Sequence, residues 1–393
     1  MPNFTATAGS SNPNSHDCGR EVARLALDRL LRNTKPAVAI VFAAIRFRMP
    51  EVLKGISEVL GAGVPVVGCT SAGEFADNFV SNKSVVIMLI GGDQLDVMTG
   101  VGTGLKADSA GAVGRMFSSL RKRTGAPKAF VKKGLLLFSD GLAGNGEKLV
   151  DNVFASAGST VDIAGGAAGD GGLFKETFVM QGGQVHKDAV VGLELGLHSP
   201  MGVGVAHGWC PSKVKGKVTK AAGGTLFEVD GKPAYKIYEA YAAAIHYPLS
   251  RSNAGAFMMN NELGVITADQ VKIRAPLKLN DDDSISMASE IHVGAEVSVV
   301  EGKCEALIAA ATQATRTAMA GLKGAKAAGV IVFDCVARKA VLQDEFQKEV
   351  DAIKKVAGDV PVIGFNTYGE IAKVAGQPAG FHNTTDVVCV IPA

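Results

Sequence analysis

The sequence predicts a mixed α/β fold of the α+β kind, in which repeated β-α-β-β units form mixed sheets covered by helices, with a β-rich middle segment. Three observations lead to this prediction. One pattern of strands and helix occurs three times, its apolar runs are short and rich in Val, Ile and Leu, and a stretch of short strands separates the second copy from the third. A chain of 393 residues is also long for a single core, so two or three units are expected.

The repeat is clearest between the two ends of the chain. VPVVGCTSAGE at 64–74 is echoed by VPVIGFNTYGE at 360–370, and each is preceded by an apolar run and an amphipathic segment. Each copy is expected to run strand, helix, strand, glycine-rich turn and antiparallel strand, with a right-handed crossover. The segments of the three copies are 37–44, 49–63 and 64–74; then 134–140, 146–158, 161–170 and 188–195; then 328–335, 341–359 and 360–370.

The chain is expected to divide into three parts. Residues 1–16 are polar and are predicted to be a disordered tail, residues 17–228 hold the first two copies, and residues 229–393 hold the third. A helix signal follows the second boundary, with Asp230 as a candidate cap and Pro233 near the first helical turn.

Composition and charge indicate the cellular compartment and exclude some classes of binding partner. The formal net charge of +2 provides no strong field to attract nucleic acid or an anionic membrane. The six cysteines are scattered without a C-x-x-C pair, which is typical of a reducing compartment and not of a zinc ribbon. The N-terminus lacks a signal-peptide layout, and no apolar run reaches the roughly 20 residues of a membrane helix. We therefore expect a cytoplasmic protein with no membrane insertion, no nucleic-acid partner and no metal.

Polar side chains and glycines follow the buried strands of all three copies, where open α/β sheets bind small molecules at strand carboxyl ends. The candidate ligand-binding residues of these turns are Cys69, Thr70, Ser71, Asp140, Gly165, Gly166, Asn366, Thr367 and Tyr368. The acidic residues Glu74, Asp170 and Glu370 close the same turns, and we expect them to accept backbone N–H bonds. For the hydroxyl and amide groups of the turns, binding and structural roles both stay open.

Two further groups are candidates for a pocket. His207 ends the strand in GVAHGW and Trp209 lies on the same face, although a histidine satisfied within the fold is the competing interpretation. Arg338 follows VFDC at a strand end, where a guanidinium would grip a ligand carboxylate, and a surface ion pair explains it equally well. Arg274 carries the same ambiguity. Asn383 in FHNTT either closes a turn or reaches the pocket, and we expect the turn.

No catalytic motif is recognisable. The P-loop, dinucleotide, nucleophile-elbow and zinc-protease patterns are missing, which argues against an enzyme. The competing hypothesis is a cysteine- or serine-dependent acyl or amide enzyme with Cys69 or Ser71 as nucleophile, and it requires a base within hydrogen-bond reach. No C-x-x-C-H haem attachment occurs, so any haem would be held without a covalent bond through a side chain such as His207.

The chain resembles the FIST family from about residue 20 to about residue 390. The motifs that carry the resemblance, in the family's order, are VVGCTSAGE, LLLFSDGLAGN, IAGGAAGD, AVVGLEL, GVGVAHGW, VTKAAGGTLFEVDGKPAYKIY, HVGAEVSVV, VIVFDCVARK, IGFNTYGE and FHNTTDVV. The resemblance implies a FIST N-terminal domain over 17–228 and a FIST C-terminal domain over 229–393. It also implies an intracellular sensory module for a small ligand, with amino acids as the proposed class, and some similar proteins are linked to haem and nitric oxide sensing.

The leading hypothesis is a sensory, signal-transduction protein without catalysis. Its amino-acid-like ligand would lie between the copies, held by turn N–H groups, hydroxyls and one arginine. The sequence carries no kinase, cyclase or methyl-accepting segment, so the resemblance predicts a stand-alone receptor that acts through a separate signalling protein. No cofactor is expected, and a non-covalent haem sensor using His207, the enzyme described above and a scaffold for protein partners are the alternatives.

Overall fold

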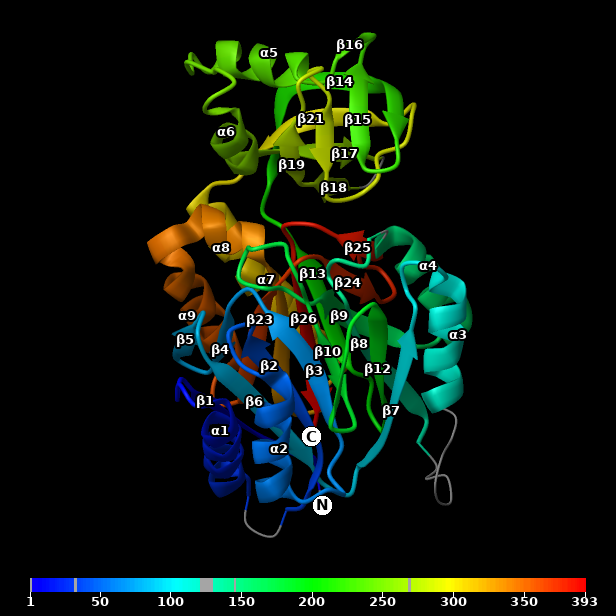
Figure 1. Ribbon diagram of the computed structural model, residues 1–393, viewed down its shortest axis with the longest axis vertical. Coiled ribbons are helices and arrows are strands. Elements are labelled where there is room, and N and C mark those ends of the chain that lie inside the picture. Colours follow the sequence, from blue (N-terminus) through cyan, green and yellow to red (C-terminus); the bar gives the residue numbers. More distant parts are fainter. Residues whose placement is uncertain (1, 32–33, 121–129, 145, 268–269) are drawn as a thin grey trace.

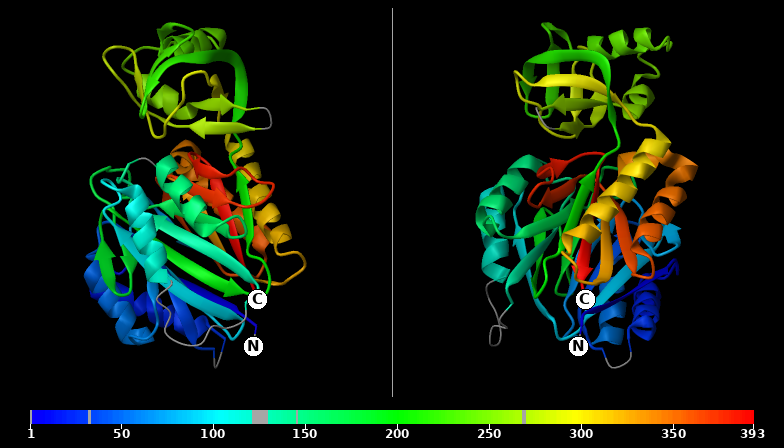
Figure 2. Two further views of the ribbon diagram at one scale, coloured as in Figure 1. Left: turned by 90° about the vertical axis from the view of Figure 1, so that its right-hand side faces the viewer. Right: turned by 180° about the vertical axis from the view of Figure 1, so that it is seen from behind.

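The computed structural model describes residues 2–31, 34–120, 130–144, 146–267 and 270–393. It consists of a body built from three similar sheets with their helices, and of a β-rich unit at one end of that body (Figure 1). Both chain termini lie at the opposite end of the body (Figure 2).

The three copies share one order of elements: a leading strand, a helix, a strand, a second helix, a parallel strand, a short hairpin and a last antiparallel strand. The first copy comprises β1 (Phe4–Ser10), α1 (Ser15–Arg29), β2 (Pro36–Ala44), α2 (Met49–Leu60), β3 (Val66–Ser71), β4 (Glu74–Ala76), β5 (Phe79–Ser81) and β6 (Val85–Gly91). The second comprises β7 (Leu95–Thr103), α3 (Ser109–Leu120), β8 (Lys132–Ser139), α4 (Gly146–Ala157), β9 (Asp162–Ala167), β10 (Val179–Gln181), β11 (Gln184–His186) and β12 (Ala189–Leu197).

The third copy follows the same order but carries an insertion after its leading strand. It comprises β13 (Gly202–Ala206), α7 (Cys304–Gly321), β22 (Ala327–Cys335), α8 (Val336–Leu342), the 3-10 turn η1 (Gln343–Glu345), α9 (Phe346–Ala357), β23 (Val362–Thr367), β24 (Glu370–Lys373), β25 (Gly380–His382) and β26 (Asp386–Pro392). In each copy the two central strands pair in parallel, β2 with β3, β8 with β9 and β22 with β23. The last strand of each copy is antiparallel to the first of that pair, so the predicted three-copy α+β pattern is confirmed.

The short hairpins are exchanged between the copies in a ring. Strand β4 of the first copy pairs with β23 of the third, β24 of the third pairs with β9 of the second, and β10 of the second pairs with β3 of the first. The resulting sheet orders are β1-β6-β2-β3-β10-β11, β7-β12-β8-β9-β24-β25 and β13-β26-β22-β23-β4-β5. Every sheet of the body is therefore completed by a neighbouring copy.

The main core lies where the inner faces of the three sheets meet. Phe42, Phe138, Phe333 and Phe365 come from all three copies and contact one another with ring centroids 4.3–6.2 Å apart. Each outer sheet face is covered by a helix pair, α1 with α2, α3 with α4, and α7 with α9, and each pair has its own apolar cluster. Three sheets therefore surround one common core, each with helices on its outer face.

The β-rich unit is the insertion between β13 and α7. Its elements are β14 (Cys210–Ala222), β15 (Thr225–Val229), β16 (Lys232–Pro233), α5 (Lys236–Ala244), α6 (Ala254–Asn260), β17 (Asn261–Ile266), β18 (Val271–Arg274), β19 (Pro276–Leu279), β20 (Ile285–Met287) and β21 (Glu296–Glu301). The unit has its own apolar core, which α5 and α6 help to form. Figure 1 shows it seated over the end of the body at which α8 and β25 lie.

Two predicted boundaries differ from the structure. The predicted tail over 1–16 is wrong, because residues 4–10 form β1, whose Ala6 and Ala8 are buried against the first copy's helices. The predicted division between residues 228 and 229 falls inside β15, so it cuts through the sheet of the β-rich unit. The unit begins at β14 because β13 belongs to the sheet of the third copy.

Candidate functional site

A cavity of about 430 Å³ lies between the body and the β-rich unit, and we call it the roof cavity. Its lining residues are Gly141, Leu142, Gly172, Phe174, Met259, Glu262, Ala275, Pro276, Leu277, Ala288, Cys335, Val336, Ala337, Ala340, Tyr368 and Asn383. The body contributes segments that follow the carboxyl ends of β8, β9, β22 and β23, which is where open α/β sheets bind ligands. The β-rich unit contributes the opposite wall, and most of the lining is apolar.

Glu262 on β17 is the carboxylate of the roof cavity. Its side chain is 1% exposed, and Thr384 donates a hydrogen bond from Oγ1 to Glu262 Oε2 at 2.9 Å. Burial raises the pKa of Glu262 well above its ordinary value, the Thr384 bond lowers it, and the nearby Glu370 charge raises it further. Burial therefore favours the protonated form of this carboxyl group.

An aromatic pair forms another part of the wall. The rings of Phe174 and Tyr368 stack with centroids 4.5 Å apart at 14°. The Tyr368 hydroxyl donates to Asp170 and accepts the Gly172 N–H at 2.9 Å, which fixes its orientation. Burial first, then the bond to Asp170, raises the pKa of Tyr368, so its hydroxyl stays protonated.

A smaller pocket of about 60 Å³ shares Gly141, Ala288 and Tyr368 with the roof cavity and contains Asp140. The Asp140 carboxylate accepts the Thr177 hydroxyl at 2.5 Å and the backbone N–H groups of Leu142 and Asp188 at 2.9 and 2.6 Å. Asp140 thus borders the pocket, but its carboxylate orders the surrounding loops.

Most of the predicted turn residues of the first copy have structural roles. Cys69 is fully buried in the main core, and burial raises the pKa of its thiol. Thr70 accepts the Phe178 N–H at 3.0 Å, and Ser71 donates to Glu74 at 2.5 Å. None of these three side chains lines the roof cavity. The nucleophiles proposed for an enzyme are therefore buried inside the fold.

The predicted turn residues of the other two copies also have structural roles. Gly165 and Gly166 lie in β9, where an added Cβ would be 2.4 Å from the Leu137 carbonyl oxygen and 2.7 Å from a Thr367 methyl group, so close packing explains these glycines. Asn366 donates from Nδ2 to Asp334 at 2.9 Å. The Thr367 hydroxyl donates a hydrogen bond to the Glu370 carboxylate of the same turn. Of the predicted turn residues, Tyr368 alone lines the roof cavity.

The acidic turn residues accept hydrogen bonds, as predicted. Asp170 accepts the backbone N–H groups of Phe174, Lys175 and Glu176 at 2.7–3.0 Å. Glu74 accepts from Ser71 and from both the N–H and the hydroxyl of Ser84. The carboxylates of these turns are therefore satisfied by groups of the fold.

Arg338 does not face a ligand. Its guanidinium is fully buried beside three carboxylates, and it also donates to the carbonyl oxygens of His207 and Leu307 at 2.8 and 3.0 Å. The three carboxylates are Asp334, Glu349 and Asp386. Neither sequence interpretation holds, because the partners are carboxylates of the core rather than a ligand or a surface residue. The three carboxylates also form the one acidic cluster with metal-like spacing among the described residues, and the guanidinium occupies its centre.

His207 and Trp209 lie apart from the roof cavity. His207 lines a second pocket of about 280 Å³, together with Lys272 and His382. Its Nδ1 accepts the Trp209 N–H at 3.0 Å, and the ring also bonds to the backbone of Val271. Burial, followed by the Arg338 charge, lowers the pKa of His207 to about 4, so the ring is neutral. Both ring nitrogens are therefore used by the protein backbone, and an axial haem bond would have to displace one of these interactions.

Trp209 is a core residue of the third copy. It is 3% exposed, and its Nε1 donates to the Thr384 carbonyl oxygen at 3.2 Å. Arg274 is also buried and donates to Glu147 at 2.5 Å, an ion pair that joins the β-rich unit to α4. The Arg274–Glu147 ion pair therefore helps to hold the two parts of the chain together.

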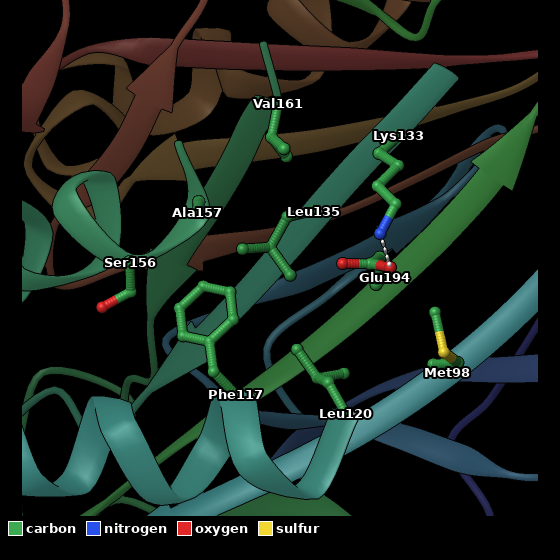
Figure 3. Close-up of a pocket in the computed structure, with 9 residues that line it drawn as sticks. All are labelled: Met98, Phe117, Leu120, Lys133, Leu135, Ser156, Ala157, Val161 and Glu194. Atoms are coloured by element: carbon green, nitrogen blue, oxygen red, sulfur yellow. Dashed lines mark hydrogen bonds and ion pairs between the residues drawn. The ribbon is translucent and has the colours of Figure 1, made fainter. Parts of the chain in front are cut away.

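Another pocket, of about 300 Å³, opens on the outer side of the second sheet (Figure 3). Phe117, Leu120 and Ala157 supply apolar surface from α3 and α4, and Lys133 is paired with Glu194 at 2.9 Å. None of the predicted binding residues lines it, and its charged groups neutralise each other.

Sequence reasoning missed most of the roof cavity. Glu262 carries a sequence signal, because it is the single carboxylate in β17 and precedes the apolar run LGVI. Phe174 follows a glycine pair in a loop and is 55% exposed, which is unusual for phenylalanine. Asn383 was expected to close a turn. It donates to the His382 carbonyl oxygen, and it also accepts the Ser289 hydroxyl at 3.0 Å while lining the cavity.

An apolar cavity with a few placed polar groups, at strand carboxyl ends and between two parts of a chain, is typical of a small-molecule-binding protein. The FIST N domain matches residues 37–232 and the FIST C domain matches residues 234–373. The chain therefore belongs to the FIST family, whose domains are sensory domains that bind small ligands, and the predicted resemblance is confirmed.

Two individual proteins are similar to this chain, one over a short stretch and one at low identity. A stretch of 79 residues is 39% identical to an uncharacterized protein of Methanocaldococcus jannaschii, covering 20% of this chain and 15% of that protein. The crystal structure of phosphoribosylformylglycinamidine synthase II of Thermotoga maritima matches 99% of this chain and 72% of its own at 11% identity, with a TM-score of 0.23. None of the helices in the described part of the chain has the length and apolarity that a membrane crossing requires.

Proposed function

We propose that this protein is a non-catalytic sensory receptor whose small ligand binds in the roof cavity. The observation that carries the proposal is the cavity itself, a largely apolar space at the strand carboxyl ends with one buried carboxylate, Glu262, in its wall. Family membership supports the same role, since FIST domains bind small ligands. We also propose a cytoplasmic location, because all six cysteines are free thiols.

The amino-acid-like ligand expected from the sequence is narrowed here to a small molecule with an apolar body and one polar head. Leu142, Phe174 and Met259 offer apolar contacts for the body. The polar groups available to the head are Glu262 and Asn383, whereas Arg338 is withdrawn into its buried cluster. The arginine grip predicted from the sequence is therefore not part of the proposal.

The signal would be passed to a separate signalling protein through the position of the β-rich unit. The cavity has one wall on each part of the chain, so a ligand that contacts both walls prefers the arrangement in which they are closest. Leu277 from the unit and Phe174 from the body are 57% and 55% exposed at the cavity, which gives a partner an apolar surface that changes with that arrangement.

The proposal is tested by filling the cavity. Ala337 lines it, and Ala337→Phe places a ring in the space, whereas Ala309→Phe adds the same ring to an exposed position on α7. Purified wild-type protein is screened by thermal shift against amino acids, amines, alcohols and carboxylic acids of similar size. A ligand present at about 100 times its dissociation constant adds roughly 2.7 kcal/mol to the free energy of unfolding.

We expect the melting shift of any hit to disappear in Ala337→Phe and to persist in Ala309→Phe. A shift that survives in both variants would place the ligand outside the roof cavity. If the whole panel leaves the wild-type melting temperature unchanged, a scaffold for protein partners becomes the better explanation.

A further inference from the structure

We infer that the ligand's polar head is a protonated amine that forms an ion pair with Glu262, and that the ligand carries no carboxylate to accompany it. The inference rests on the proposed function, because it takes the roof cavity as the ligand site. It adds the chemical class of the ligand, an amphipathic organic cation.

The placement of Glu262 is the first argument. Glu262 is 1% exposed, lines the cavity, and accepts one hydrogen bond from the described residues, at Oε2 from Thr384. A buried carboxyl group normally satisfies its oxygens with several donors, because an unpaired charge in a protein interior is costly. An ammonium group in the cavity would supply the donor that the second oxygen of Glu262 lacks among these contacts.

The charge balance of the cavity is the second argument. Among the sixteen lining residues, all within the described part of the chain, there is no lysine or arginine. The cations of the neighbouring strand, Lys272 and Arg274, are both held by Glu147 at 2.8 and 2.5 Å. A ligand carboxylate would thus be desolvated without a counter-charge, whereas an ammonium would meet Glu262. The cavity consequently favours cations over acids and over zwitterions.

The rest of the lining suits the body of such a cation. Phe174 and Tyr368 are stacked, and an aromatic face attracts a cation by its quadrupole. Leu142, Met259 and Leu277 provide apolar surface for a hydrocarbon chain or ring. One carboxylate, an aromatic pair and an apolar wall together recognise an amine attached to a hydrocarbon.

The groups around Glu262 determine how it responds. Thr384 faces it from the β25–β26 connection and Glu370 from β24. Cys335 at the end of β22 and Tyr238 on α5 are also close enough for their charges to interact with it, and the buried Tyr238 hydroxyl has no partner among the described residues. Burial first, and then the Glu370 charge, raises the pKa of Glu262, so the empty site favours the protonated carboxyl group.

Binding then involves a balanced proton transfer. The ammonium ligand enters with its charge, the Glu262 carboxyl loses its proton to solvent, and the ion pair forms. Up to one proton is released for each ligand bound. A neutral alcohol of the same shape would release none.

The experiment is calorimetry with three probes of one shape: 2-phenylethylamine, 2-phenylethanol and 3-phenylpropanoic acid. Each is titrated into the full-length protein at pH 7 in two buffers of different ionisation enthalpy, which gives the number of protons released. We expect the amine to bind at least about tenfold more tightly than the alcohol, because a hydrogen-bonded charge is being recognised, and the acid to bind more weakly than the alcohol. Proton release should accompany the amine alone.

The variants separate this inference from simple packing. Glu262→Gln should weaken amine binding at least about tenfold and abolish proton release, while Glu262→Asp should retain proton release with a smaller loss of affinity. Glu296→Gln changes an exposed carboxylate on β21 of the same unit and should change neither quantity. The melting temperature of each unliganded variant is recorded, so that a folding defect is recognised.

The results distinguish the two proposals. If the alcohol or the acid binds as tightly as the amine, or if Glu262→Gln binds the amine with wild-type affinity, the inference of a cation is overturned while the cavity remains a ligand site. If none of the three probes binds to the wild-type protein, the cation inference is overturned as well. Whether the cavity binds any small ligand is decided separately by Ala337→Phe.

Discussion

Replacing Arg338 with methionine should destabilise the third copy strongly. The guanidinium lies among Asp334, Glu349 and Asp386, all buried, with Arg338 nitrogens 3.2 Å from Asp334 and 2.6 Å from Asp386. Methionine has a similar length but supplies no charge and no donor. Removing one partner of a buried ion pair costs about 3–5 kcal/mol, and the two lost bonds to carbonyl oxygens add to that cost. We expect a loss near the upper end, about 5 kcal/mol at pH 7.5.

The loss should depend on pH. Burial already raises the pKa of Glu349 to about 8, and the Arg338 charge opposes that rise. Without the guanidinium the folded state must hold more protons than the unfolded chain, whose carboxyl groups ionise near pH 4.5. The free energy of unfolding of the variant therefore falls as the pH rises, and the damage at pH 5.5 should be smaller than at pH 7.5.

The assay is urea unfolding monitored by the fluorescence of Trp209, the single tryptophan of the chain. Trp209 belongs to the apolar cluster of the third copy, so it reports on the part of the fold that contains Arg338. Arg251→Met is the matched control, because Arg251 is half exposed and pairs with Asp283 at the surface, where an ion pair contributes about 0–1 kcal/mol. The reasoning is refuted if Arg338→Met and Arg251→Met unfold at the same urea concentration, or if the loss in Arg338→Met is unchanged between pH 5.5 and 7.5.

Two further outcomes are expected. Burial is the main cause that raises the pKa of Glu370 to about 8, so between pH 4.5 and 8 the folded state retains a proton that the unfolded chain releases. The free energy of unfolding should therefore fall with rising pH by up to about 1.4 kcal/mol per pH unit. Glu370→Gln should flatten that slope in urea titrations from pH 5 to 8. An unchanged slope would mean that another group holds the proton. Cys69 is fully buried with a raised thiol pKa, whereas Cys210 is exposed, so iodoacetamide at pH 7.5 should modify Cys210 in the native protein and Cys69 only after unfolding, as peptide mass spectrometry would show. Stoichiometric labelling of native Cys69 would restore the case for a nucleophile.

The repeated part of the fold could be predicted because each copy carries its own local signals. The parallel strands are continuous apolar runs, and the turn carboxylates recur at Glu74, Asp170 and Glu370. The exchange of hairpins could not be predicted, because the sheet that a short hairpin joins depends on contacts between distant copies. The first strand was missed although FTATAGS alternates threonine with small apolar residues, since Ala6 and Ala8 give a weaker strand signal than branched residues.

The site was harder to predict than the fold, for a physical reason. Polar residues next to buried strands, such as Ser71, Asn366 and Thr367, look like ligand-binding groups, but here they satisfy carboxylates of the fold. The sequence pattern cannot distinguish these two uses of the same donors. The roof cavity also needs the β-rich unit to be placed over the body, and no local pattern specifies that placement. Tyr368 was found because it adjoins a recognisable turn, and Glu262 was missed because it does not.

The ring of exchanged hairpins has a consequence for the order in which the protein can form during synthesis. Ala76 in β4 pairs with Ile363 in β23, so the hairpin of the first copy leaves the ribosome long before its sheet exists. The first sheet can be complete once β10 of the second copy has been made, but β4 of the first copy cannot pair until β23 of the third copy emerges. Pairing between segments so distant in sequence slows folding. The growing chain therefore carries a short unpaired edge through most of translation, and closure of the body is reserved for its final residues.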